Sequence, residues 1–563
     1  MASRQQQPLF ILSEGNERTK GQAAQDSNIR AGKAVANSVR TTLGPKGMDK
    51  MLVGSSGDVV ITNDGATILN EMDIEHPAAQ MIVEVAETQE VEVGDGTTTA
   101  AVLSGELLSE AEELLDSDLH PTVIVEGYHE AARLAAEAID EQILDIDLDD
   151  DILISVAESS MTGKGTGDVT ADLLAEQVVT AVRRVAYERI DREDIRIHTQ
   201  TGAASSATEL VDGVILSEEP ANANMPRTLE DASVAILESK LDVRTGEADA
   251  EYSISSVDQL NAAVEAEDSE LRGYAKTLSE AGVEVVFCTK DIDDRVASYL
   301  ADAGILAFSN VSSKKSKALA KATGAKHLGT VEGIEDADLG SLASLSIETY
   351  NDEDTVFVDG GPHSNYVTLF VRGSTDHVID ELERALNDAI DVVIAALNKG
   401  GVVPGAGGTE VAISEYVRSR AASVEGRKQL AIEAFASAVD SLPRTLAENS
   451  GMDSIDALVE LRSTYDSEGR AGIVSTGRSG EIGNPVVAGI LDPAAVKHEA
   501  IKSATECSFR PRLASLSSLS TYLYEWDESS TLLISPMRSG GRSNGSSRPV
   551  STKPRTSREH VYS

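Results

Sequence analysis

The chain contains few aromatic residues and few cysteines. The first shortage limits how its hydrophobic cores are built, and the second excludes disulfide-rich and cysteine-zinc proteins. Only 4% of its 563 residues are Phe, Trp or Tyr, so its hydrophobic cores must be built mainly from Ala, Val, Ile and Leu. Its two cysteines, Cys288 and Cys507, are too few for a disulfide framework or a cysteine zinc site. No run of about 18 apolar residues occurs, so no membrane-spanning helix is expected.

Positive charge is also scarce: 48 Lys and Arg residues stand against 94 Asp and Glu, which gives a net charge of −46. A nucleic-acid interface needs a basic face, so we expect no nucleic-acid partner. The ordinary interpretation is a solvated acidic surface that keeps the protein soluble. A sharper hypothesis is adaptation to a salt-rich cytoplasm, where screening weakens the repulsion between carboxylates. A protein that stays folded and assembled in dilute buffer would contradict that hypothesis.

The N-terminal sequence MASRQQQPLF lacks the long apolar core and cleavage site of a signal peptide, which predicts a cytoplasmic protein. It belongs to a polar, Gln-rich stretch, residues 1–27, that we expect to form a loose N-terminal arm. The apolar content of 41% is enough for well-buried cores. Because a chain of this length is too long for a single core, we expect roughly two to four domains.

The spacing of apolar residues divides the rest of the chain into helical and mixed regions. Residues 28–150 are predicted to be mostly helical, interrupted by two short strands, Lys50–Val53 and Asp58–Thr62. The acidic stretch Asp145–Asp151 is typical of a linker. Residues 152–215 mix helical and strand patterns.

The pattern becomes α/β between residues 216 and 365. Short buried strands are predicted at Val234–Leu237, Val283–Phe287 and Gly304–Phe308, with helical stretches between them. Within this region, residues 243–278 are acidic and contain few apolar side chains. They are either a solvated helical hairpin or a mobile projecting arm.

Amphipathic helices are predicted again over residues 378–398 and 409–463. The composition then changes at Cys507: residues 507–563 are rich in Ser, Arg and Pro and contain the only tryptophan, Trp526. We expect this tail to be atypical and mainly disordered, with Leu513–Tyr524 as a locally structured stretch.

The most informative motif is Gly94-Asp95-Gly96-Thr97-Thr98-Thr99-Ala100, which lies between two helical patterns. Its glycines predict a tight loop, and its threonines predict the start of the second helix. A helix N-terminus offers free N–H groups and partial positive charge, which suit a phosphate, and Asp95 beside it is a candidate ligand for Mg²⁺. No Walker A sequence, GxxxxGK(S/T), occurs in the chain, so the motif points to an ATP site of another kind.

Other candidate motifs are ambiguous when each is taken alone. Leu43–Gly47 is a common helix-ending turn, although its glycines would let the backbone approach a ligand. Asn63-Asp64-Gly65 is a plain Asx turn, and Lys164 between two glycines would ordinarily be a solvated surface lysine. Asp388 lies by spacing near the edge of an apolar helix face, where a solvent-exposed or N-cap carboxylate is the ordinary role. Val403–Glu410 opens another helix and is a second candidate for a ligand-facing helix start.

Taken together, these motifs resemble the group II chaperonins, the thermosome-type family of archaea, over about residues 8–506. The resemblance rests on the runs Thr41–Lys50, Ile61–Leu69, Asp73–Ala79 and Gly94–Thr99. It implies an ATP-dependent molecular chaperone subunit that binds non-native client proteins and folds them inside a double ring of identical or related subunits. The acidic composition is similar to that of halophilic members.

The resemblance also implies a mainly α fold with α/β parts, in which the chain turns back on itself to build three domains. The implied assignment is an equatorial ATPase domain (28–150 and 400–506), an intermediate domain (151–215 and 366–399), and an apical substrate-binding domain (216–365) with a helical protrusion or lid (243–278).

Cofactors and residue roles follow from the resemblance as well: ATP and Mg²⁺, with K⁺ as a further candidate. Asp64 and Asp388 would be the catalytic carboxylates around the attacking water, and Asp95 would hold Mg²⁺. Lys164 would sense the γ-phosphate and couple hydrolysis to domain closure. The other nucleotide-binding residues would be Leu43, Gly44 and Pro45 along the phosphates, Gly96, Thr97, Thr98 and Thr99 as donors, and Gly405, Gly407 and Asp492 at the nucleoside.

The sequence departs from the family pattern at two places. The usual Gly-Gly-Gly-Ala reads Gly405-Ala406-Gly407-Gly408, and we expect little effect because an alanine with negative φ keeps a backbone contact. After Glu506 the family continues with a short helix and an apolar strand that pairs with the neighbouring subunit, whereas this chain continues with Cys507–Arg512.

An altered end leaves a second function open, a nucleotide-binding subunit that is assembly-defective or regulatory. A third function, an unrelated ATPase that shares only the loop motifs, is disfavoured by the length of the resemblance.

Overall fold

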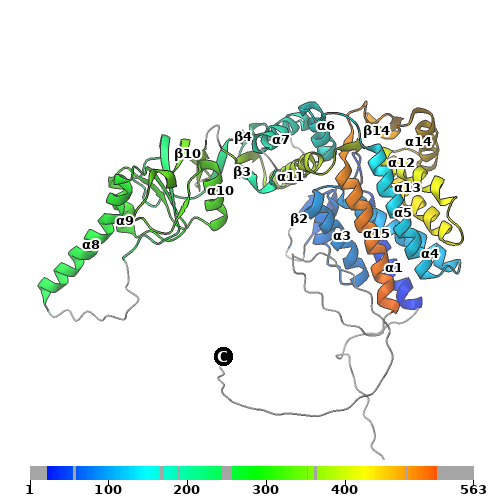
Figure 1. Ribbon diagram of the computed structural model, residues 1–563, viewed down its shortest axis with the longest axis horizontal. Coiled ribbons are helices and arrows are strands. Elements are labelled where there is room, and N and C mark those ends of the chain that lie inside the picture. Colours follow the sequence, from blue (N-terminus) through cyan, green and yellow to red (C-terminus); the bar gives the residue numbers. More distant parts are fainter. Residues whose placement is uncertain are drawn as a thin grey trace, which may run out of the picture. The chain divides into compact units, whose positions relative to one another are not determined.

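The computed structural model describes residues 22–54, 57, 59–164, 170–186, 190–243, 256–351, 353–360, 364–476 and 479–516 (Figure 1). All of them fall within one unit of internal contacts, residues 1–516. Three large hydrophobic cores and one small one organise these residues. None of the described helices combines the length and apolar character needed to span a bilayer.

The first core is built by helices from both ends of the chain, drawn in blue and cyan and in yellow and orange in Figure 1. Helix α4 (Thr97–Asp116) packs on α1 (Gln22–Arg40), on α13 (Lys428–Asn449) and on α15 (Ala494–Leu516). Many buried positions are alanines, whose small side chains let the helices approach closely. The other elements are α2 (Gly65–Glu71), α3 (Pro77–Val93), α5 (Pro121–Gln142), α12 (Gly408–Ala421), and the antiparallel pairs β1 (Lys50–Val53) with β2 (Val59–Thr62) and β13 (Val402–Pro404) with β16 (Leu491–Pro493). The small core lies where α14 (Ser454–Glu468) and the antiparallel pair β14 (Gly472–Thr476) with β15 (Ser479–Gly483) pack on α12 and α13.

The second core lies around a three-stranded sheet and also combines two separate stretches of chain. Its central strand β12 is parallel to β3 and antiparallel to β4. The amphipathic pattern of the long helix α11 places buried residues such as Leu382, Leu386 and Val393 against this core. The elements are α6 (Asp150–Met161), α7 (Ala171–Val185), the short turns η1 (Arg192–Asp194) and η2 (Ser205–Ala207), β3 (Ile195–Thr201), β4 (Glu209–Val211), β12 (Val367–Gly373) and α11 (Asp376–Asn398).

The third core surrounds a seven-stranded sheet with the order β5-β11-β10-β6-β7-β8, in which β9 pairs with β6. Strands β6, β7 and β8 are parallel, and Phe287 of β7 pairs in register with Phe308 of β8, so that their rings stack. Cys288 at the end of β7 is fully buried. The elements are β5 (Gly213–Ser217), β6 (Thr228–Leu237), α8 (Val257–Glu280), β7 (Val285–Cys288), α9 (Asp294–Asp302), β8 (Leu306–Phe308), α10 (Ser313–Thr323), β9 (His327–Leu328), η3 (Asp336–Asp338), β10 (Gly340–Tyr350) and β11 (Glu353–Asp359).

The structure confirms the mainly helical fold with α/β parts and most predicted elements. The strand pair near residue 50 is present, although β2 begins at Val59 and Asp58 lies outside the described residues. The three predicted buried strands correspond to β6, β7 and β8. Helix α8 occupies much of the region 243–278, but residues 244–255 lie outside the described part, so neither interpretation of that region is tested.

Two predicted boundaries near the N-terminal half are wrong. The arm was predicted to reach residue 27, but α1 begins at Gln22 because Gln22–Ser27 includes good helix formers such as alanine. The linker was predicted to reach Asp151, but the side chain of Asp149 accepts the N–H of Ile152 at 3.0 Å and starts α6 there.

The predicted tail boundary at Cys507 is also wrong, because α15 continues without a break to Leu516. Cys507 and Ser508 are buried, and the thiol of Cys507 donates to the carbonyl oxygen of Met81 at 3.5 Å. Packing against α3 therefore extends the helix past the change in composition. Residues 517–563, with Trp526 among them, lie outside the described residues.

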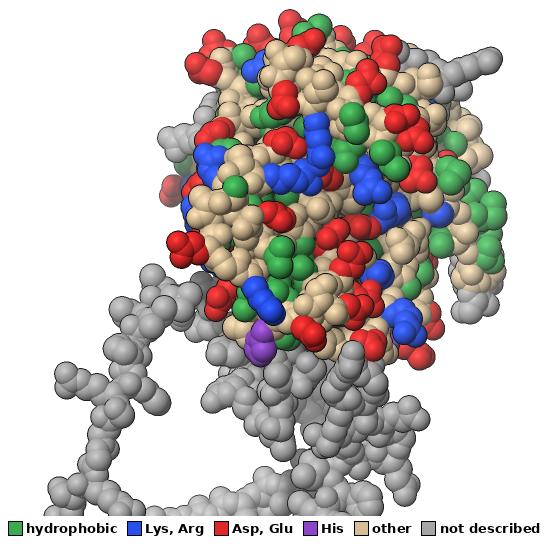
Figure 2. Space-filling model, turned by 90° about the vertical axis from the view of Figure 1, so that its right-hand side faces the viewer, with side chains coloured by type: hydrophobic (Ala, Val, Ile, Leu, Met, Phe, Trp, Pro, Cys, Tyr) green, Lys and Arg blue, Asp and Glu red, His purple; other side chains and the backbone are tan. Residues whose placement is uncertain are grey.

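The surface carries the charge expected from the composition. Figure 2 shows one face of the molecule, on which Asp and Glu side chains are spread widely with Lys and Arg among them. This is the solvated acidic surface that the net charge of −46 predicts.

Candidate active site

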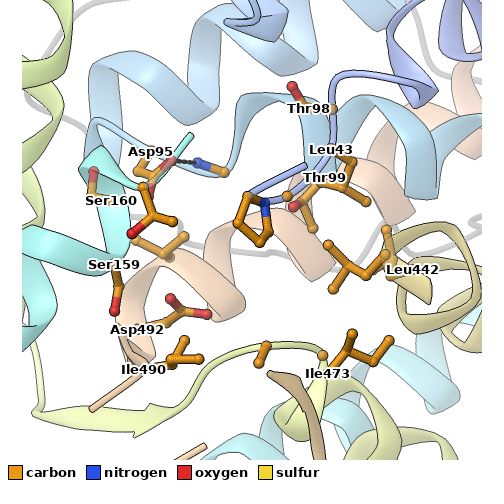
Figure 3. Close-up of a pocket in the computed structure, with 18 of the residues that line it drawn as sticks. Leu43, Asp95, Thr98, Thr99, Ser159, Ser160, Leu442, Ile473, Ile490 and Asp492 are labelled. Carbon is orange, nitrogen blue, oxygen red and sulfur yellow. Dashed lines mark hydrogen bonds between the residues drawn. The ribbon is translucent and has the colours of Figure 1, made fainter. Parts of the chain in front are cut away.

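A cavity of about 330 Å³ gathers segments that lie far apart in the sequence (Figure 3). Its volume falls at the lower end of the range for small-molecule sites, roughly 300–1,000 Å³. Most of the predicted site residues line it: Leu43, Gly44, Pro45, Asp64, Asp95, Gly96, Thr97, Thr98, Thr99, Lys164, Gly407 and Asp492. Gly405 and Asp388 are not among the lining residues, but Gly405 precedes the lining residue Ala406 and Asp388 pairs with Lys164.

The loop between α3 and α4 forms one side of the cavity. Gly94 and Gly96 have φ values of 73° and 81°, a conformation that glycine adopts without strain, and together they make the tight loop that the sequence predicted. Helix α4 then begins at Thr97, and Gly96 caps it without a side chain. The first N–H groups of α4 therefore have no partner within the helix and are available to an anion in the cavity.

Asp95 lies in this loop and is buried. Its Oδ1 accepts the backbone N–H of Gly96 at 2.6 Å. Burial raises the pKa of Asp95, while the nearby Lys164 opposes that increase. Because burial disfavours the ionised form of this carboxylate, a cation bound beside it would stabilise that form strongly.

Asp64 joins this loop from the end of β2. Its Oδ2 accepts the N–H of Thr67 at 2.7 Å, which caps α2, and its Oδ1 accepts the hydroxyl of Thr97 at 3.1 Å. Asp64 thus makes the local hydrogen bond to the backbone that its sequence predicted. It also contacts the first residue of α4. The same carboxylate holds two helix starts together at the cavity.

The turn after α1 supplies a third part of the lining. Gly44 has φ of 85°, and the amide of Asn449 donates to the carbonyl oxygen of Leu43 at 2.8 Å. Asn63 reaches across to the loop that carries Lys164 and donates to the carbonyl oxygen of Gly163 at 2.8 Å. The loops around the cavity are therefore fixed to one another by asparagine side chains that donate to backbone carbonyl oxygens.

Lys164 and Asp388 form a buried ion pair. Only 13% of the Lys164 side chain and 17% of the Asp388 side chain is exposed, so the solvated roles that were the ordinary expectation for both are wrong. Burial raises the pKa of Asp388 to about 8, helped by the negative charges of Asp95 and Asp64 and opposed by Lys164. For Lys164, the carboxylates outweigh burial and raise its pKa above the usual lysine value. A lysine and three carboxylates thus share this side of the cavity.

The opposite side is formed by the segment between β13 and α12 and by β16. The N–H of Gly405 donates to the carbonyl oxygen of Ile490 at 2.9 Å, and a Cβ on Gly405 would lie 3.2 Å from Oδ1 of Asp492. Gly407 has φ of 77° and caps α12. Gly405 and Asp492 are therefore neighbours.

Ala406 contradicts the expectation of a negative φ, because its φ is 55°. An L-residue with a Cβ pays roughly 1–2 kcal/mol in this left-handed region. The loop holds the conformation nevertheless, since the carbonyl oxygen of Ala406 accepts the N–H of Ile473 at 2.8 Å.

Sequence reasoning missed a second buried lysine in the cavity. Lys497 is only 11% exposed, and its Nζ lies 2.7 Å from both Glu410 Oε1 and Asp492 Oδ2. These two carboxylates outweigh burial and raise the pKa of Lys497 above its usual value. The other oxygen of Glu410, Oε2, is buried and has no hydrogen-bond partner among the described residues. Lys497 and Glu410 are 87 residues apart and carry no local motif, so only the fold brings them together.

Helix α6 and an apolar surface complete the lining. The hydroxyl of Ser159 accepts the N–H of Leu491 at 3.1 Å, which ties α6 to β16. The hydroxyl of Ser160 is buried and has no hydrogen-bond partner within the described part of the chain. Figure 3 shows Leu442, Ile473 and Ile490 facing the same cavity. The cavity therefore combines donor groups that suit phosphates with apolar side chains that suit a nucleoside.

The residues present also fit Mg²⁺. Within the described ranges, no group of three or more His, Cys, Asp or Glu side chains could hold a metal ion alone. Mg²⁺ is commonly held by one or two carboxylates together with substrate phosphates and water. Asp95, next to free N–H groups that suit a phosphate, meets that requirement.

The comparisons with known proteins agree with this geometry. A sequence model of the TCP-1/cpn60 chaperonin family matches residues 35–509. The chain belongs to the TCP-1/cpn60 chaperonin family. Being a chaperonin, it is an ATP-hydrolysing chaperone subunit, and the predicted group II resemblance is confirmed. The match also excludes an unrelated ATPase that shares only the loop motifs.

Curated relatives of this chaperonin include subunits from salt-loving archaea. It is 68% identical to thermosome subunit 3 of Haloferax volcanii, over 90% of this chain and 98% of the relative. It is 48% identical to thermosome subunit alpha of Halobacterium salinarum, over 89% of each chain. It is 47% identical to thermosome subunit beta of Archaeoglobus fulgidus, over 90% of this chain and 94% of the relative. The chaperonin is thus of the halophilic type that its acidic composition predicted.

Proposed function

We propose that the cavity binds ATP with Mg²⁺ and hydrolyses it, and that hydrolysis drives the folding of non-native proteins. The buried Lys164–Asp388 pair beside Asp95 and the start of α4 is the observation that carries this proposal. Phosphoryl transfer needs positioning and charge neutralisation more than covalent chemistry. These residues supply a cation, carboxylates and free N–H groups in one enclosed place.

Each residue has a role in this reaction. The N–H groups of Thr97 to Thr99 and the turn Leu43–Pro45 hold the phosphates. The N–H of Gly96 joins them when it exchanges its acceptor in this structure, Asp95 Oδ1, for a phosphate oxygen. Asp95 would then hold Mg²⁺, which would neutralise phosphate charge. Asp64 and Asp388 orient the attacking water, and the raised pKa of Asp388 suits a group that accepts a proton near neutral pH.

The remaining residues act at the ends of the nucleotide. Lys164 contacts the γ-phosphate and also binds Asp388 on α11. Release of the γ-phosphate after hydrolysis would therefore be coupled to a movement of that helix. Gly405, Gly407 and Asp492 contact the nucleoside. K⁺ remains a further candidate cofactor.

We also propose that the three large cores are three domains. The first core corresponds to the equatorial domain, the second to the intermediate domain and the third to the apical domain with its lid at residues 243–278. The exposed Val257, Leu260 and Val264 on α8 support a surface there that meets apolar client protein.

The working protein would be a cytoplasmic double ring of identical or related subunits. This proposal is supported by relatives that are named as subunits of several types, alpha, beta and numbered ones. The alternative is a subunit that binds nucleotide but assembles poorly or regulates others. Light scattering at high salt, with and without ATP, distinguishes them: a particle of many subunits supports the ring, and a monomer that binds ATP supports the alternative.

The site itself is tested by the Asp388→Ala variant. We expect phosphate release to fall by on the order of 100-fold or more while ATP binding is retained, because the change removes a proton acceptor and not a phosphate contact. Asp380→Ala is the matched control, since Asp380 lies on the same helix and is exposed. Unchanged turnover in Asp388→Ala would overturn the assigned role.

A further inference from the structure

Arg192, outside the cavity, binds helix α11 at two successive turns. Its Nε lies 2.7 Å from Asp391 Oδ1, and its Nη2 donates to the side-chain oxygen of Asn387. Its Nη1 donates to the carbonyl oxygen of Ile195 at 2.7 Å, where β3 begins. One planar guanidinium thus joins the start of a strand to residues i and i+4 of a helix. Such a fork fixes orientation better than a single contact does.

Asp391 is in turn packed against the loop of the cavity. A Cβ added to Gly94 would lie 2.1 Å from the Cβ of Asp391 and 2.9 Å from its Oδ2. Gly94 has φ of 73°, so both its conformation and the close approach of Asp391 require glycine there. The next residue is Asp95. The side chain of Asp391 therefore lies between Arg192 on one side and the loop that carries Asp95 on the other.

The same helix carries Asp388, one residue after Asn387. Residues 388 and 391 are three positions apart, so at about 100° of rotation per residue their side chains leave α11 only about 60° apart. Asp388 meets Lys164, and Asp391 meets Gly94. A rotation or slide of α11 would consequently move Asp388 relative to Asp95 and Lys164 together.

We propose that Arg192 is a positioning residue for ATP hydrolysis: by holding Asn387 and Asp391 it sets the rotation of α11, and so the place of Asp388 in the reaction. The inference rests on the proposed function of the cavity. Arg192 contacts neither the cavity nor any group assigned to the nucleotide. Its removal should therefore affect turnover and leave binding of ATP nearly unchanged.

The main test is the steady-state ATPase activity of Arg192→Gln in the full-length, assembled protein. We expect kcat to fall about 10- to 100-fold with the KM for ATP nearly unchanged, since a misplacement of the order of 1 Å has this effect. Arg192→Lys should recover only part of kcat, because an ammonium cannot reproduce the fork. The double variant Arg192→Gln with Asp391→Asn should lose no more than Arg192→Gln alone.

Arg183→Gln is the matched control. Arg183 also binds one carboxylate, Asp150 at 2.9 Å, and one carbonyl oxygen, that of Leu148 at 2.6 Å, but within the described ranges no hydrogen bond or ion pair joins it to α11 or to the loop. An equal loss of kcat in this control, a loss confined to KM, or an unchanged kcat in Arg192→Gln would each overturn the proposal.

Asn387→Ala covers the case in which Arg192→Gln fails to assemble. It removes one arm of the fork and leaves the Arg192–Asp391 ion pair, so kcat should fall a few-fold; an unchanged kcat overturns the proposal. Failure of the proposed function is recognisable separately, because then Asp388→Ala and the unaltered protein would have the same activity. If Asp388→Ala is inactive and Arg192→Gln is fully active, only the positioning role is wrong.

Discussion

The two sides of the cavity each contain a buried lysine, but the carboxylates around them are arranged differently. Among the described residues, Lys164 makes one ion pair, with Asp388, and it follows helix α6 in a glycine-containing loop. Lys497 lies within helix α15 and binds two carboxylates, Glu410 and Asp492, from two other elements. Two partners from separate elements hold a lysine in one place, whereas a single partner can be exchanged for another anion.

This difference indicates that the two sides of the cavity have different roles. The side with Lys164 holds a carboxylate whose pKa is raised to about 8 and which is poised to change its partner or its proton. The side with Lys497 is a fixed wall that orients Asp492. Chemistry is expected on the first side and recognition on the second.

The largest effect on stability should come from breaking the fixed wall with Lys497→Met. It would leave Glu410 and Asp492 without their shared cation, and breaking a buried ion pair in this way costs about 3–5 kcal/mol of unfolding free energy. Urea unfolding at constant high salt measures the loss. Adding Glu410→Gln should restore part of the stability, because one uncompensated charge disappears. A Lys497→Met protein as stable as the parent would show that the wall is not held by charge.

The role of Asp388 on the Lys164 side is tested by the pH dependence of kcat/KM for ATP. If ionised Asp388 accepts a proton, activity is lost as pH falls through its pKa, and burial moves that midpoint up to about 8. We therefore expect an acid limb well above the ordinary aspartate range, measured from about pH 6 to pH 9 at constant salt. Asp380→Ala should leave the midpoint unchanged. A flat profile over this range would contradict a role for Asp388 as base.

The smallest expected effect is that of Ala406→Gly in the fixed wall. Ala406 has φ of 55°, and glycine relieves that strain, so stability should rise by about 1 kcal/mol. Ala422→Gly is the matched control: Ala422 follows α12 with φ of −60°, where glycine brings no relief and should lower stability slightly. A gain in the control, or a loss at Ala406, would contradict the assignment of strain.

Local sequence was enough for the side of the cavity built on Gly94–Thr99. Two glycines and a run of threonines between two helical patterns define a loop and a helix start without reference to the rest of the chain. The buried strands of the third core were equally predictable, because their apolar runs are too short for a helix and rich in Val, Ile and Phe, which favours strands.

Long-range contacts were not predictable by the same means. Lys497 and Glu410 have no motif, and nothing in the neighbourhood of Arg192 points to α11. The end of α15 was misjudged because burial of Cys507 and Ser508 against α3 outweighs a local change in composition. Ala406 was misjudged because its backbone conformation is set by the loop around it.

The burial of both cysteines makes the protein a convenient starting point for fluorescence experiments. Cys288 and Cys507 are 0% and 3% exposed, and burial raises the pKa of the Cys288 thiol, which lowers its reactivity. A thiol-reactive dye should therefore ignore the native cysteines. New surface cysteines placed on α8 and on α14 would accept a donor and an acceptor dye without any prior removal of cysteines, and their distance would report on movement during the ATP cycle.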